Sequence, residues 1–281
     1  SGSLGTVIPP SITFLIYGMI TGESISNLFL SGIMPGIVFG LCLCISVFIK
    51  SKKENWKSDS QRSSLKSIFI SIKESFWGLM SPVIVLGGIY SGIFTPTEAA
   101  SVAVIYSFII SVFIYKELNL EKLVETLFDT AKTTGIILLI IMNAGIFSWV
   151  LTQQSIASNL TEMALSITHN KYIMLIIINI IFLIAGCVMD NTSAMYILVP
   201  IIMPVAKALD INMIHLGTII VLNLSIGQVT PPVGPNLYVA ANIGKVKFEN
   251  IVKNMVPLII MSLIALLIIT YLPWFSLVFI K

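Results

Sequence analysis

The chain has 281 residues, of which 56% are hydrophobic and 10% are charged, and its formal net charge is +3. A soluble domain carries roughly 25% charged residues, so this composition excludes a soluble globular protein and predicts a surface that faces lipid. The cationic residues lie in short segments between apolar runs and include a single arginine, Arg62, so no nucleic-acid partner is expected.

Apolar runs follow one another along the chain, separated by short polar segments. A helix needs about 20 residues to cross a bilayer. Several runs are close to that length, whereas 195–208 and 234–243 are shorter and are predicted to be re-entrant or broken helices. The runs are 11–22, 28–49, 79–93, 97–115, 135–152, 172–188, 195–208, 212–226, 234–243 and 255–272.

Two further stretches, 64–77 and 119–133, mix charged and apolar residues at helical spacing and are predicted to lie along the membrane interface. The segment 50–73 carries seven of the sixteen basic residues, so it is expected in the cytoplasm. If each later span crosses the membrane once and 172–208 is a hairpin that enters from outside, the lysines after residue 244 also lie on the cytoplasmic side.

The sequence contains an internal repeat. A shift of 222 residues aligns 3–22 with 225–244 without a gap and pairs Pro9-Pro10 with Pro231-Pro232. A proline lacks the amide hydrogen and its ring clashes with the preceding turn of a helix, so each G-x-V-x-P-P motif predicts an interrupted helix. The span count places the two copies in opposite directions, and inverted repeats with interrupted helices are typical of secondary transporters.

An interrupted helix frees backbone carbonyls, which a membrane protein tolerates only where the break lines an enclosed cavity. Freed carbonyls can bind a cation there, and the N-termini of half-helices can face an anionic solute. A proline kink that only shapes packing is the alternative. The second copy of the repeat follows a predicted hairpin at 186–210, whereas the first copy starts at the beginning of the sequence without such a hairpin before it. We therefore expect this sequence to be the C-terminal portion of a longer protein.

Three motifs closely resemble the large membrane subunit of tripartite ATP-independent periplasmic (TRAP) transporters, and the resemblance runs along essentially the whole chain. They are SGSLGTVIPPS (1–11), GIFTPTEAASVA (92–103) and GQVTPPVGPNLYVA (227–240). The resemblance implies an all-α polytopic membrane protein, an inverted-repeat elevator-type transporter with a re-entrant hairpin and unwound helices. It implies sodium as coupling ion, no organic cofactor, and import of an organic acid such as sialic acid or a C4-dicarboxylate across the bacterial inner membrane. The implied partners are a small membrane subunit, a periplasmic solute-binding protein and the lipid bilayer.

On this basis we expect five functional parts. They are a transport-domain part of repeat 1 (1–27), scaffold helices with cytoplasmic interfacial segments (28–133), connecting helices (134–170), a transport-domain part of repeat 2 (171–250), and a C-terminal transmembrane helix (251–281).

Asp190 opens the motif MDNTSAM at the expected tip of the hairpin. An ionisable group at membrane depth marks a functional site by default, and capping the following helix is the alternative role. Hard oxygen ligands suit a small hard cation. The expected sodium-binding residues, which act largely through backbone carbonyls, are Ser1, Ser3, Gly5, Gly186, Asp190, Asn223, Ser225, Gly227 and Thr230. The expected solute-binding residues are Ser11, Asn191, Thr192, Ser193, Pro232 and Asn236.

The repeat pairs Ser3 with Ser225 and Gly5 with Gly227, which suggests two pseudo-equivalent sodium sites. Glu98 follows a threonine-rich segment, and its expected role is to fix the start of a helix; direct contact with solute is the alternative. The glycines at 18, 22, 32, 36 and 40 are expected to let helices pack closely.

The cysteines Cys42, Cys44 and Cys187 are expected to be small apolar side chains without a metal or redox role, and His169 and His215 to be solvated or capping residues. The chain contains no H-E-x-x-H, G-x-S-x-G or P-loop motif, so it is not expected to be an enzyme. A channel with re-entrant half-helices and a stand-alone sodium–dicarboxylate carrier remain as alternatives.

Overall fold

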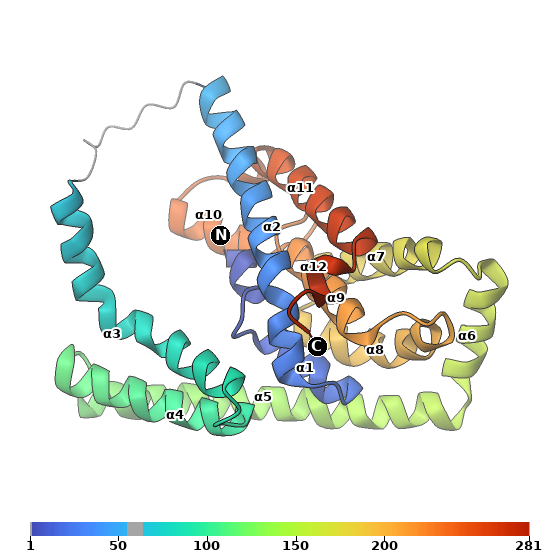
Figure 1. The fold of residues 1–281 in the computed structure, drawn as a ribbon, viewed down its shortest axis with the longest axis horizontal. Coiled ribbons are helices and arrows are strands. Elements are labelled where there is room, and N and C mark those ends of the chain that lie inside the picture. The colour runs from blue at the N-terminus through green and yellow to red at the C-terminus, as the bar shows by residue number, and fades with distance from the viewer. Residues whose placement is uncertain (1, 55–63, 281) are drawn as a thin grey trace. The chain divides into compact units, whose positions relative to one another are not determined.

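The computed structural model describes residues 2–54 and 64–280, and the regular structure in these two ranges is entirely helical (Figure 1). Six helices in this part of the chain are long and apolar enough to cross a membrane. These spans are Ile25–Lys53, Lys66–Tyr90, Pro96–Ile114, Leu120–Leu151, Lys171–Val188 and Phe248–Tyr271. The protein is therefore a polytopic, all-α membrane protein, as the composition predicts.

The chain divides into two compact units, one formed by Ser1–Glu54 and Ile140–Lys281 and the other by Asn55–Leu139. This division follows contacts within the chain and does not test the five functional parts expected from the sequence. Those parts therefore stay a prediction.

The smaller unit contains α3 (Leu65–Tyr90), α4 (Pro96–Ile109), a π-helical turn (Ile110–Ile114) and the first part of α5 (Leu120–Gln153). α3 and α4 pack together, and the Tyr106 hydroxyl donates to the Trp77 carbonyl at 2.7 Å. The stretches 64–77 and 119–133 are not separate helices, because each supplies the first turns of α3 or α5. Their position along the membrane interface stays a prediction.

The start of α4 confirms the expected role of Glu98. The Thr95 hydroxyl accepts from the Glu98 amide at 3.3 Å, and the Glu98 carboxylate accepts from the Thr95 amide at 2.8 Å. This reciprocal pair is a capping box, which satisfies amide groups that the first turn of a helix leaves without partners.

The larger unit is built around α9 (Met213–Gly227), in which every residue from His215 to Gly227 is buried. The helices packed against α9 are α1 (Ile12–Thr21), α2 (Ile25–Lys53), α7 (Lys171–Val188), α8 (Asn191–Ala208), α11 (Phe248–Tyr271) and α12 (Trp274–Leu277). The short helix η1 (Gly2–Thr6) also contacts α9, whereas α6 (Ile156–Ile167) packs on α8 and α10 (Pro235–Gly244) on α11. A helix that is apolar on all sides belongs inside a protein, which explains the central place of α9.

Glycines on α2 allow the N-terminal segment to approach this helix closely. A Cβ atom at Gly32 would lie 2.8 Å from the Val7 carbonyl oxygen, and one at Gly36 would lie 2.8 Å from the Ile8 side chain. The packing role expected for these two glycines is confirmed. Gly22 acts differently, because it ends α1 in the left-handed conformation with φ of 76°.

His215 is buried with 3% of its surface exposed, so the expectation of a solvated or capping histidine is wrong. Asn212 takes the capping role and accepts from the amides of Ile214 and His215. The imidazole therefore turns inward, where it contacts the Ser276 hydroxyl and the Thr270 carbonyl. Cys42 and Cys187 are buried and Cys44 is exposed, and all three are free thiols.

Candidate functional site

The first Pro-Pro motif interrupts the chain between η1 and α1, as the sequence predicts. The Pro9-Pro10 bond is cis, and the connection runs from Val7 to Ser11. The Ser11 hydroxyl donates to the Thr6 carbonyl at 2.5 Å, so the side chain closes the gap between the two helices. Both Ser3 and Ser11 are buried.

The second motif interrupts the chain between α9 and α10 and resembles the first in its backbone. The Pro231-Pro232 bond is also cis, and a helix of ten residues follows each break. The Thr230 hydroxyl donates to the Ile226 carbonyl at 2.7 Å, and Gly234 has φ of 47°. The prediction of two interrupted helices is therefore confirmed.

Two contacts join these breaks to each other and to the end of α7. The hydroxyl oxygens of Thr6 and Ser225 lie 2.5 Å apart, which links η1 to α9. A Cβ atom at Gly227 would lie 2.5 Å from the Gly186 backbone, so α9 and α7 touch there main chain to main chain. We refer to residues 2–11, 186–193 and 223–236 together as the junction.

The junction contains buried polar atoms for which the described residues supply no hydrogen-bond partner. They are the Asn223 Oδ1 atom and both polar atoms of the Asn191 side chain. A buried polar atom without a partner costs about 1–3 kcal/mol, and such an atom in a native protein calls for an explanation such as a ligand, an ion or ordered water. The junction is therefore the candidate functional site.

Comparison with known proteins shows the family of the chain. The family model described as "Tripartite ATP-independent periplasmic transporter, DctM component" matches residues 1–275. The chain belongs to this family. It is 40% identical to the isethionate TRAP transporter permease protein DctMQ of Oleidesulfovibrio alaskensis, over 97% of this chain and 43% of that protein.

Two further relatives are large TRAP permease proteins of Vibrio cholerae. The C4-dicarboxylate permease DctM is 40% identical over 98% of this chain and 65% of its own length. The sialic acid permease SiaM is 34% identical over 98% of this chain and 64% of its own length. The chain thus spans about two fifths to two thirds of the length of these relatives. Their names are those of transporters, so the prediction that the chain is not an enzyme is confirmed.

The junction contains oxygen atoms of the kind that bind hard cations. Among the residues that the structure describes, no group of three or more His, Cys, Asp and Glu side chains could hold a metal ion. The junction offers instead the amide oxygen of Asn223, the hydroxyls of Ser3, Ser225 and Thr230, and backbone carbonyls. Hard cations take oxygen ligands of this type, whereas transition metals select imidazole or thiolate.

Asp190 caps α8, so the capping interpretation of this residue is confirmed. Its carboxylate accepts from the Ser193 amide at 3.0 Å and from the Ser193 hydroxyl at 2.6 Å, and the side chain is exposed. These bonds hold the carboxylate at the edge of the junction. Contact between Asp190 and a bound cation stays a prediction.

The remaining predicted residues differ in burial. Ser1 lies outside the described residues. The buried set is Ser3, Ser11, Gly186, Asn191, Asn223, Ser225 and Gly227; the half-buried set is Thr192, Ser193, Thr230 and Asn236; the exposed set is Gly5 and Pro232. Gly5 and Gly227 are partners in the repeat but differ in their surroundings. A Cβ atom at Gly5 would meet nothing within 4 Å, whereas one at Gly227 would meet the Gly186 backbone. Whether these residues bind sodium or solute stays a prediction.

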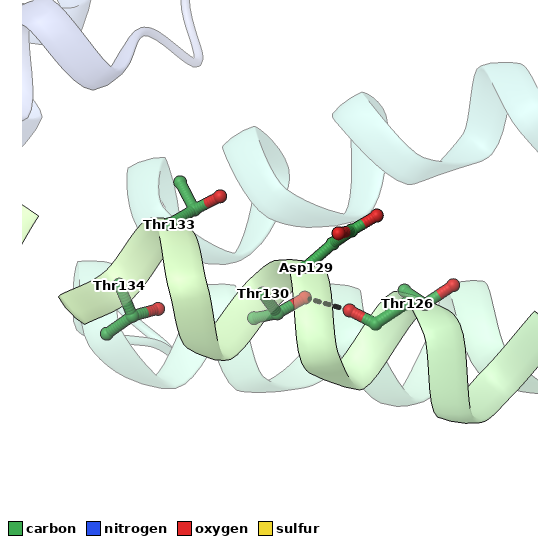
Figure 2. Close-up of a pocket in the computed structure, with 5 residues that line it drawn as sticks. All are labelled: Thr126, Asp129, Thr130, Thr133 and Thr134. Carbon is green, nitrogen blue, oxygen red and sulfur yellow. Dashed lines mark hydrogen bonds between the residues drawn. The ribbon is translucent and has the colours of Figure 1, made fainter. Parts of the chain in front are cut away.

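A second polar feature lies on α5 and is separate from the junction. Thr126, Asp129, Thr130, Thr133 and Thr134 line an open groove on this one helix (Figure 2). The Thr126 hydroxyl donates to the Lys122 carbonyl, and the Thr130 hydroxyl donates to the Thr126 carbonyl, both at 2.7 Å. These two hydroxyls are satisfied within the helix, and all five residues that line the groove are exposed, so the groove offers no buried polar atoms of the kind found in the junction.

Proposed function

We propose that the chain is the ion- and solute-binding part of a sodium-coupled secondary-active importer of organic acid anions in the bacterial inner membrane. The observation that carries this proposal is the meeting of two interrupted helices at buried oxygen and amide groups without partners. The names of the relatives support the solute class, because isethionate, C4-dicarboxylates and sialic acid are all organic anions.

The solute is assigned to the tip of the hairpin formed by α7 and α8. The Asp190 carboxylate already caps the N-terminus of α8, so the assignment rests on the neighbouring Asn191. Asn191 is the first residue of α8, and its amide has one oxygen acceptor and two hydrogens without partners although the side chain is buried. The Asn191 amide can therefore donate to a carboxylate, with the hydroxyls of Thr192 and Ser193 nearby in sequence.

The cation is assigned to the end of α9 and the first break. Asn223 Oδ1 is fully buried and has no hydrogen-bond partner among the described residues. Ser225, two residues further along α9, contacts Thr6 beside the first break. The inward sodium gradient supplies the driving force for uptake, because it favours loading of the cation site from outside. The proposal includes an elevator-type movement of 1–27 and 171–250, a small membrane subunit and a periplasmic solute-binding protein.

The experiment is uptake into proteoliposomes containing the purified transporter with its small membrane subunit. Labelled sialic acid, succinate and isethionate are compared with and without an inward sodium gradient and the cognate binding protein. Saturable uptake that requires both supports the proposal, and the preferred label gives the solute class.

Two other outcomes would revise it. Sodium-dependent uptake without the binding protein would assign the chain to a stand-alone carrier. Flux that neither saturates nor responds to sodium would indicate a channel and remove the sodium site from the junction.

A further inference from the structure

A line of buried polar side chains leads from the junction across three helices. The Asn223 amide nitrogen on α9 donates to Asn179 Oδ1 on α7 at 2.7 Å. The Asn179 amide nitrogen donates in turn to the Thr270 hydroxyl oxygen on α11 at 3.1 Å. None of the three side chains is more than 4% exposed. Sequence reasoning did not select Asn179 or Thr270 as part of a site.

The hydrogen bonds give this line a direction. A carboxamide nitrogen has two hydrogens, and Asn223 uses both, one to Asn179 and one to the Ile219 carbonyl at 2.8 Å. Exchanging the oxygen and nitrogen of Asn223 would place Oδ1 against two acceptor oxygens. The Asn223 oxygen is thereby held on the side of its amide that faces away from these partners, and it is the one polar atom of that side chain left without a hydrogen bond.

Asn179 is oriented in the same way. Its oxygen accepts from Asn223 and its nitrogen donates to Thr270, so exchanging the two atoms would set two amide nitrogens against each other. The backbone carbonyl of Thr270 lies 3.3 Å from the His215 imidazole nitrogen Nε2. This contact links the backbone of α11 to α9. The orientation of Asn223 thus depends on residues of α7 and α11 that lie outside the junction.

We propose that Asn179, oriented by Thr270, is a positioning residue that holds Asn223 Oδ1 as an oxygen ligand for the coupling cation. This inference rests on the sodium coupling in the proposed function and adds residues that act through another side chain. Partners that orient a metal ligand typically contribute about 10- to 100-fold to metal affinity. Without Asn179, the Asn223 amide nitrogen keeps only its bond to the Ile219 carbonyl, so one of the two bonds that orient the side chain is lost.

The test is a sodium titration of thermal stability in the purified, detergent-solubilised transporter, with potassium keeping the ionic strength constant. The sodium concentration that gives half of the maximal shift in Tm reports cation affinity without a transport assay. Asn179→Leu removes the acceptor at similar volume, and Thr270→Val removes the hydroxyl isosterically. Thr218→Val is the matched control, because Thr218 is a fully buried hydroxyl on α9 whose bonds go to Ser31 and Ile214.

We expect Asn179→Leu to raise the half-maximal sodium concentration about 10-fold, Thr270→Val to raise it by a smaller factor, and Thr218→Val to leave it unchanged. If Asn179→Leu does not fold, the half-maximal sodium concentration of Thr270→Val alone tests the positioning role. Equal losses of Tm in potassium for all three variants, with unchanged sodium dependence, would overturn the positioning role while leaving the proposed function intact. A wild-type Tm that does not distinguish sodium from potassium would overturn the sodium coupling itself.

Discussion

Replacing Gly227 by alanine tests the contact between α9 and α7. The added Cβ atom would lie 2.5 Å from the Cα and carbonyl carbon of Gly186 and 2.9 Å from its oxygen. Carbon atoms in favourable contact are about 3.5–4.0 Å apart, so the two backbones must separate by about 1 Å. Overpacking of this kind costs about 1–3 kcal/mol.

Gly5→Ala is the matched control, because Gly5 is the repeat partner of Gly227 and a Cβ atom there meets nothing within 4 Å. This substitution should be neutral or stabilise by about 0.4–1 kcal/mol, since it restricts the unfolded chain. At about 2–4 °C per kcal/mol, Gly227→Ala should lower Tm by roughly 2–12 °C while Gly5→Ala leaves it unchanged or raises it. A Tm for Gly227→Ala at or above that of the wild type would refute the close contact.

Three further predictions concern the cap of α4, the glycine row of α2 and the hairpin tip. Thr95→Ala removes the capping hydroxyl and should cost about 0.5–2 kcal/mol, seen as a lower Tm with unchanged solute affinity; an unchanged Tm would contradict the capping role. Gly32→Ala places a Cβ atom 2.8 Å from the Val7 carbonyl oxygen. Because Val7 belongs to the first break, we expect a lower Tm and a higher half-maximal sodium concentration. A half-maximal sodium concentration like that of the wild type would show that this contact does not affect the cation site. Asn191→Leu removes two unpartnered buried atoms, so it should raise the Tm measured without solute by removing a cost of about 1–3 kcal/mol and raise KM for uptake; a lower Tm with unchanged KM would contradict its assignment to the solute.

The breaks and the caps could be predicted from sequence because their causes are local. Pro9-Pro10 and Pro231-Pro232 exclude a continuous helix wherever they fold, and the fixed shift between them indicates a common role. Thr95 and Glu98 stand three residues apart, which is the spacing of a capping box.

The inward-facing polar residues could not be predicted in the same way. Asn179 stands alone in the apolar run of α7, and its partners Asn223 and Thr270 lie 44 and 91 residues further along the chain. Helical periodicity says which residues share a face, but not which distant side chain that face meets. A polar amide within an apolar span was the available signal, since polar groups in membrane helices usually face the protein interior.

The repeat relates residues whose surroundings differ within the described chain. It pairs Gly5 with Gly227, yet the first is exposed and the second touches Gly186. The difference arises because α7 packs on the end of α9, and within the described chain η1 has no helix of that kind in main-chain contact with Gly5.

The most direct test of the account is simultaneous flux of labelled sodium and labelled organic anion into proteoliposomes, with wild-type transporter and with Asn223→Leu. The account predicts that the wild type carries the two labels together, that omitting either one abolishes accumulation of the other, and that Asn223→Leu loses both. Anion uptake by the wild type in potassium alone, or coupled flux of normal size through Asn223→Leu, would contradict the assignment of the cation site to the end of α9.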